Sequence, residues 1–203
     1  MALKDHSLDD KIIKAAFDEF MEFGFQKASI RKIADRAGVT PGAVYTRYDS
    51  KDDLFCSLVS NFLSAVKTQS EPIGKMYYDL LESKNVDALL DAIRKEEKIY
   101  LDILFQYYDE CILFFCRSEG SSIYAMIQKM MEHKTVETVT FLKEMAQGDI
   151  DLDGVGMIMG EQFHYYQQIL EKGYSKEKAV SCMKTVEIFL EAGWRDLFER
   201  ILQ

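Results

Sequence analysis

The chain has 203 residues, of which 48% are hydrophobic and only 2 are proline, so it can bury a sizeable helical core. Its formal net charge is -9 at pH 7, which argues against a protein that coats nucleic acid with its whole surface. No apolar run approaches the length of a membrane span and the first residues are unlike a signal peptide, so we expect a cytoplasmic protein with no membrane partner.

The N-terminal region predicts two helices separated by a short connection. Residues 7–10 resemble a capping box that opens the first helix, and Gly24 follows its last turn. Ser29 can cap a second helix over residues 30–36. Ile33 and Ala34 of the second helix face inward. A small three-helix core can form from Phe17, Phe20, Phe25 and Ile30.

A turn and a third, very short helix follow. Gly38 suits the turn because glycine adopts a left-handed backbone conformation at no steric cost. Thr40 and Pro41 suit the N-cap and the first position of a helix that ends near residue 46. The pattern predicts a helix-turn-helix, which places its second helix in the major groove of DNA.

The charge distribution fits this prediction. Residues 26–51 carry six basic and two acidic groups, whereas the rest of the chain is strongly acidic. A local basic patch on an acidic body is expected of a small DNA-reading domain.

The remainder of the chain also predicts helices, so we expect an all-α fold. Residues 50–53 open a fourth helix that reaches about residue 68, and Glu71-Pro72-Ile73-Gly74 is the clearest break. We divide the chain into a DNA-binding domain (1–50) and a larger helical domain (51–203). Later helices are expected near residues 75–83, 86–117 (with a possible break at 95–98), 122–147, 154–172 and 176–202.

From Lys11 to Leu54 the chain resembles the N-terminal domain of the TetR family of bacterial transcriptional regulators. Arg47 and Tyr48 depart from the family pattern, which usually has His or Tyr and then Phe. The matching residues are Ile13, Ala16, Phe17, Phe20, Gly24, Ser29, Ile33, Ala34, Ala37, Gly38, Val39, Gly42, Tyr45, Ser50, Lys51 and Leu54.

The resemblance implies a ligand-responsive regulator, most often a repressor, that binds a palindromic operator in double-stranded DNA. It implies that Tyr45 and Lys51 contact backbone phosphates and that Thr40, Pro41 and Ala43 approach base edges. Lys51 would also lie at a helix N-terminus, where an anion is favoured. The full set of expected DNA-binding residues is Ser29, Arg31, Thr40, Pro41, Gly42, Ala43, Tyr45, Arg47, Tyr48 and Lys51.

The resemblance further implies a homodimer formed by the last two helices. Both helices carry stripes of small and aromatic residues, which allow close helix approach but could equally face the chain's own core. The expected interface residues are Gly156, Gly160, Phe163, Gln167, Cys182, Thr185, Phe189 and Ala192.

The resemblance also implies a pocket for a small-molecule effector in the middle of the chain, a region that is rich in Tyr, Phe and Met. Such a set would suit a mostly apolar ligand with one or two polar groups, although ordinary core packing is the alternative. The expected pocket residues are Phe62, Tyr77, Phe105, Tyr108, Tyr124, Met130 and His164.

No pattern predicts catalysis, a cofactor or a metal. Residues 149–154 imitate the start of a calcium loop, but Gly160 occupies the position that needs a bidentate Glu. We therefore expect no enzyme. Two alternatives stay open: a small-molecule-binding or metabolic protein with a non-functional helix-turn-helix, and a regulator controlled by a protein partner.

Overall fold

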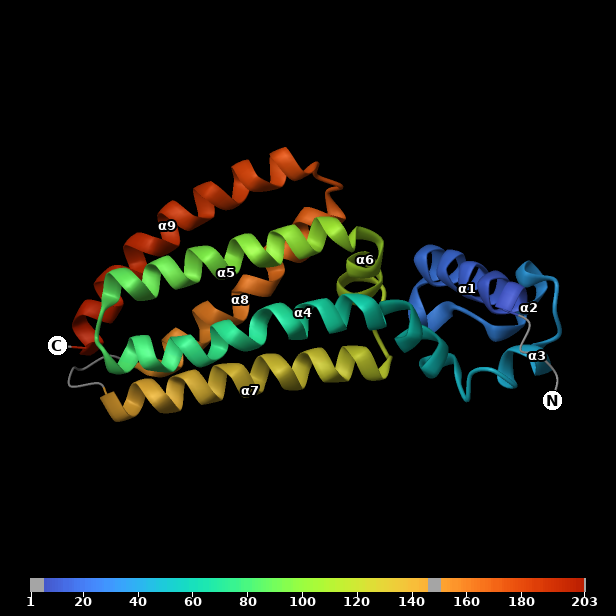
Figure 1. The fold of residues 1–203 in the computed structure, drawn as a ribbon, viewed down its shortest axis with the longest axis horizontal. Coiled ribbons are helices and arrows are strands. Elements are labelled where there is room, and N and C mark those ends of the chain that lie inside the picture. Colours follow the sequence, from blue (N-terminus) through green and yellow to red (C-terminus); the bar gives the residue numbers. More distant parts are fainter. Residues whose placement is uncertain (1–5, 146–150, 203) are drawn as a thin grey trace. The chain divides into compact units, whose positions relative to one another are not determined.

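The computed structural model describes residues 6–145 and 151–202, and every regular element in these ranges is an α-helix (Figure 1). This confirms the all-α prediction. Residues 149 and 150 of the calcium-loop-like sequence lie outside the described ranges. None of the described helices is long and apolar enough to cross a membrane. The helices are α1 (His6–Lys27), α2 (Ile30–Ala37), α3 (Pro41–Tyr45), α4 (Lys51–Glu82), α5 (Val86–Gln106), α6 (Tyr108–Cys116), α7 (Ser122–Met145), α8 (Leu152–Glu171) and α9 (Lys176–Leu202).

The chain forms two compact units. Unit 1 contains residues 1–63 and 109–128, and unit 2 contains residues 64–108 and 129–203. Helices α4 and α7 contribute residues to both units. Unit 1 therefore includes α6 from its second residue onward, which the expected division at residue 50 leaves out. A compact unit need not coincide with a functional domain, so the 1–50 and 51–203 division stays a prediction.

An aromatic cluster forms the core of unit 1. The ring of Phe20 stacks on that of Phe25 at 6.1 Å, and Phe55 meets both rings edge-on at 4.9 and 5.3 Å. Phe20 and Phe25 were expected in this core, but Phe55 comes from α4, beyond the expected domain. The aromatic contacts thus join the fourth helix to the first.

Gly24 interrupts α1 with φ 71° and ψ 167°, a conformation that is almost exclusive to glycine. The interruption frees the backbone for a contact with residue 117, because the amide of Phe25 donates to the carbonyl of Arg117 at 2.8 Å. The Arg117 side chain forms a second hydrogen bond to α1, because its Nε–H donates to the carbonyl of Met21 at 2.9 Å. Gly24 therefore permits a reciprocal link between α1 and the residue after α6.

The substitution Gly24→Ala is expected to lower the free energy of unfolding by about 1–3 kcal/mol because it forces a side chain into this conformation. Urea unfolding followed by circular dichroism measures the effect. Gly154→Ala is the matched control, since a Cβ there meets nothing within 4 Å and φ is ordinary. The control should be neutral or slightly stabilising, and an equal loss in both variants would contradict the argument.

Two expected helix breaks are wrong. α4 continues through Pro72, whose side chain is exposed, to Glu82. A proline removes one helical hydrogen bond, but Leu81 beyond it is buried in the core of unit 2, and this packing outweighs the local preference. The charged residues 95–98 lie inside α5, and the break comes instead at Tyr107, where φ is -120° and ψ is 44°. No glycine or proline marks it in the sequence.

Unit 2 contains the antiparallel pair of α5 and α9, which Figure 1 shows side by side. Three ion pairs join α5 to α9 along their length: Asp87–Arg195 at 2.7 Å, Arg94–Glu191 at 4.0 Å and Asp102–Lys176 at 2.9 Å. The core between the helices of this unit contains the buried residues Leu81, Leu89, Leu90, Val139, Leu142, Leu152, Val155, Trp194, Phe198 and Ile201.

Candidate nucleic-acid interface

The turn between α2 and α3 has the predicted geometry. Gly38 adopts φ 70° and ψ 33°, and its amide and that of Val39 donate to carbonyls in the last turn of α2 at 3.2 and 3.0 Å. Thr40 is the N-cap of α3, and its Oγ1 accepts a hydrogen bond from the Ala43 amide at 3.2 Å. Local sequence therefore determines both the end of α2 and the start of α3.

The leading residues of α3 are exposed. Thr40, Pro41 and Gly42 lie at the surface, and Ala43 is half-buried. Val44 is fully buried and fixes the helix to the unit 1 core, while the next residue, Tyr45, is 52% exposed. The start of α3 therefore has no bulky side chains and can approach a base edge. The exposed phenol of Tyr45 lies on the same short helix and can reach a phosphate.

Ser29 occupies the N-cap of α2 with an extended backbone, but its side chain makes no cap hydrogen bond. The predicted cap is therefore wrong in its chemistry. The carboxylate of Glu19 instead holds the N-cap residue in place, because its Oε1 accepts the amide of Ser29 itself at 3.3 Å. The half-buried Ser29 hydroxyl is not used in capping, and it remains a candidate donor to a DNA phosphate.

Glu19 itself was missed by the sequence reasoning. It is fully buried in unit 1, and its Oε2 lies 3.3 Å from Nη2 of Arg36, which also binds the exposed Glu22 at 2.7 Å. The signal was present, since Glu19 interrupts the buried stripe of Ala15, Ala16 and Phe20. An acid on such a stripe indicates a buried hydrogen-bonding role.

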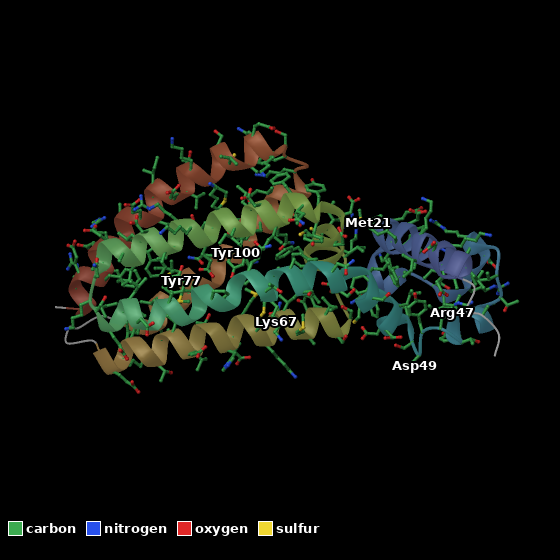
Figure 2. All side chains as sticks on the ribbon, in the orientation of Figure 1. Met21, Arg47, Asp49, Lys67, Tyr77 and Tyr100 are labelled. Carbon is green, nitrogen blue, oxygen red and sulfur yellow. The ribbon has the colours of Figure 1, made fainter. Side chains whose placement is uncertain are left out.

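The basic residues differ in their availability. Arg31 is exposed, as expected for a side chain that could meet DNA. Arg47 is paired with Asp9 and also donates to the carbonyl of Ala43 at 3.3 Å, which ties it to α1 and α3 (Figure 2). Tyr48 is half-buried, and burial raises the pKa of its hydroxyl.

Lys51 lies at the start of α4 and reaches the end of α1. Its ammonium donates to the carbonyls of Phe25, Gln26 and Ala28 at 2.7, 3.4 and 3.2 Å and stands 4.4 Å from the centre of the Phe25 ring. Burial lowers the pKa of this amine. Its part in the fold was not predicted, and its expected phosphate contact stays a prediction.

The first turn of α4 also holds the start of α7. Asp52 accepts the Ser122 amide at 2.8 Å through Oδ1 and binds the Ser122 hydroxyl through Oδ2. The thiol of Cys56 lies 3.4 Å from the same hydroxyl. Nothing in the sequence near Asp52 indicates its distant partner.

The expected pocket residues are divided between the two units, and the pocket stays a prediction. Phe62 is buried against Phe114 at 5.0 Å in unit 1, which also contains Tyr124, whereas the other five belong to unit 2. Phe105 stacks on Tyr108 at 5.8 Å. Tyr77 hydrogen-bonds to Glu96, while Tyr124, Met130 and His164 are exposed.

The expected interface residues lie on α8 and α9 of unit 2. Thr185, Phe189 and Ala192 are exposed, whereas Gly160, Phe163, Gln167 and Cys182 are half-buried. Gly156 faces α7 of its own chain, where a Cβ would stand 3.0 Å from Cγ2 of Thr135. The close approach that this glycine allows therefore occurs within the chain, and we assign Gly156 to internal packing.

Residues 12–58 match the family model of bacterial regulatory proteins, tetR family. The chain is 29% identical over 100 residues to the uncharacterized HTH-type transcriptional regulator YdgC of Bacillus subtilis (strain 168). This match covers 49% of the chain and 47% of YdgC, so the chain spans about half the length of that relative.

Two solved structures show the same fold. A TetR-like transcriptional regulator from Rhodococcus sp. RHA1 has a TM-score of 0.57 and 16% identity, with 95% of this chain and 100% of that chain covered. The fatty acid degradation regulator FadR from Bacillus halodurans has a TM-score of 0.52 and 21% identity, covering 91% and 94%. At these identities the likeness concerns the fold alone. The family model thus identifies residues 12–58 as the DNA-binding region of a tetR-family regulator, and the two solved structures share the fold.

Proposed function

We propose that the chain is a ligand-responsive repressor that binds a near-palindromic operator as a homodimer. The observation that carries this proposal is the exposed start of α3, held by a capped turn beside a basic segment. In the proposal Thr40, Pro41, Gly42 and Ala43 approach base edges, because no bulky side chain keeps the helix out of the groove.

The phosphate contacts in the proposal come from the residues around this helix. The hydroxyls of Ser29 and Tyr45 can donate to phosphate oxygens, and Arg31 adds an exposed charge. Arg47, Tyr48 and Lys51 have contacts inside the chain, so their role at DNA combines support of α3 and α4 with charge.

The dimer in the proposal forms through α8 and α9. These helices expose large apolar side chains, among which Phe189 is 80% and Met157 76% exposed. Large apolar side chains exposed on a single chain commonly mark an interface, so in the proposal a second copy covers them. Two DNA-binding domains fixed in this way would meet successive major grooves of one operator.

Ligand control follows from linkage. The two DNA-binding domains of the dimer can take an arrangement that fits the operator and one that does not. A ligand that binds unit 2 more tightly in the second arrangement lowers operator affinity, at most by the ratio of its affinities for the two arrangements. Fluorescence anisotropy on duplexes from the region flanking the chain's own gene, against random duplexes of equal length, tests the proposal. Equal affinity for both sets would overturn it.

Lys51→Ala is expected to lower the free energy of unfolding by roughly 1–2 kcal/mol, because three carbonyls at the end of α1 lose their donor. If Lys51 also meets a phosphate, binding to all sequences weakens alike and the salt slope falls by about one unit. Lys27→Ala, which removes an equal charge from an exposed position, is the control. A loss of stability with an unchanged salt slope would restrict Lys51 to its role in the fold.

A further inference from the structure

An ion pair joins the first turn of α1 to the chain just after α3. Nε of Arg47 donates to Oδ1 of Asp9, a residue 38 positions earlier. Asp9 lies before residues 12–58, the part of the chain that matches the family model, and Arg47 stands where the family usually has His or Tyr. The pair is therefore a feature of this chain that the family pattern does not supply.

The same guanidinium holds the backbone of α3, because its Nη1 donates to the carbonyl of Ala43 at 3.3 Å. The Thr46 amide donates to the carbonyl of Gly42 at 3.0 Å. The Arg47 amide donates to that of Val44 at 3.0 Å, so the Ala43 carbonyl depends on the guanidinium. The last carbonyls of a helix lack partners within it, and a basic side chain that follows the helix can bind them.

α3 depends on external contacts because it is short. It has 5 residues, and a helix of this length has too few internal hydrogen bonds to be stable alone. The Thr40 cap fixes its start, and the buried Val44 side chain fixes its middle. Arg47 adds a contact near its end, and Asp9 fixes the direction of the guanidinium.

Both partners of the ion pair are shielded from water. The side chain of Arg47 is 16% exposed and that of Asp9 is 26% exposed, whereas the exposures in the surface pair Lys14–Asp18 are 81% and 47%. A shielded, hydrogen-bonded ion pair is screened less by water and salt than an exposed one. Separation of the pair would leave two partly buried charges unpaired, which is unfavourable. The pair is therefore expected to persist when DNA is bound.

We propose that Asp9 is a positioning residue for DNA recognition, which holds Arg47 on the Ala43 carbonyl and so sets the orientation in which α3 meets base edges. Contacts to base edges read the sequence, whereas phosphate contacts act on all sequences alike. Asp9 therefore contributes to the choice of sequence without touching DNA. The inference rests on the proposed function, in which the start of α3 enters the major groove.

The negative charge of Asp9 acts in the opposite direction. A carboxylate near DNA repels the phosphates, so the loss of its charge alone is expected to tighten binding to every sequence. The positioning role instead predicts weaker binding to the preferred sequence only. The sign of the change in affinity thus separates the two effects.

Fluorescence anisotropy with two duplexes tests the proposal: the duplex that the wild-type chain selects from a random pool, and a scrambled duplex of the same composition. Asp9→Asn is expected to bind the selected duplex about 10-fold more weakly, and the scrambled duplex at least as tightly, as compared with the wild type. Asp10→Asn is the matched control, because it removes an equal charge from the next position of α1, where the side chain is exposed. The control should keep the wild-type preference for the selected duplex.

Two further variants show whether Asp9 acts through Arg47. Asp9→Glu keeps a carboxylate and should restore most of the preference. In a chain that already carries Arg47→Ala, Asp9→Asn should cause no further loss of preference. A full second loss in that background, or equal preferences in Asp9→Asn and Asp10→Asn, would overturn the positioning role.

Amide hydrogen exchange of the free chain tests the hold on α3 without DNA. Exchange in residues 40–48 is expected to be about 10-fold faster in Asp9→Asn than in Asp10→Asn, because α3 loses the contact near its end. Equal exchange in the two variants would remove the structural basis of the proposal. A wild-type chain that selects no duplex would refute the proposed function, while the exchange result would still decide whether Asp9 holds α3.

Discussion

A chain with Phe189→Glu is expected to sediment as a monomer and to lose at least about 100-fold in operator affinity, because a monomer holds only one of two half-sites. In the single chain Phe189 is 80% exposed, so the substitution costs the monomer little. In the proposed dimer it would bury an unpaired charge within an interface of roughly 2,000 Å² or more. Sedimentation velocity at micromolar concentration and circular dichroism measure the two effects.

Val136→Glu is the matched control for this experiment. Val136 is 57% exposed on α7, outside the proposed α8–α9 surface, so its variant should remain a dimer and keep its operator affinity. A wild-type chain that sediments as a monomer would refute the proposed dimer directly. Dimers formed by Phe189→Glu would show that the chain associates through another surface.

Glu19→Ala is expected to lower the free energy of unfolding by about 2–4 kcal/mol. The fully buried carboxylate accepts the Ser29 amide just before α2 and lies against Arg36, so its removal leaves a cavity and a Ser29 amide without its acceptor. Because α2 carries the turn to α3, the variant should also bind DNA less tightly at temperatures where it is still folded. Thermal and urea unfolding measure the first effect, and anisotropy the second.

Two comparisons isolate the cause. Glu22→Ala removes the exposed partner of Arg36 and should change stability by less than about 1 kcal/mol. Glu19→Gln keeps an acceptor for the Ser29 amide and should retain most of the stability that Glu19→Ala loses. If Glu19→Ala proves as mild as Glu22→Ala, the buried carboxylate does not support α2.

Local rules were sufficient for the helix-turn-helix. The left-handed conformation of Gly38 and the cap by Thr40 depend on neighbours within a few residues, and both were predicted correctly. Ser29 shows where such rules end. Its position at the N-cap was correct, but its hydroxyl makes no cap hydrogen bond, and an acid ten residues earlier accepts its amide.

Features that depend on distant packing were not predictable. The sequence around Pro72 signals a break, yet the helix continues because residues beyond it are buried in unit 2. The sequence around Tyr107 signals none, yet α5 ends there. The contacts of Lys51 with α1 and of Asp52 with Ser122 join residues 23 or more positions apart, and no short pattern records them.

Unit 1 is assembled from two separate stretches of the chain, since residues 109–128 join residues 1–63. During synthesis the amide of Phe25 and the carboxylate of Asp52 must therefore wait until Arg117 and Ser122 have left the ribosome. The helix-turn-helix can form early from local contacts, but its supporting contacts come only after residues 64–108 have been made. A newly made helix-turn-helix region is therefore expected to be less protected from proteases than a mature one. For the same reason, full DNA-binding competence is expected only when most of the chain has been made.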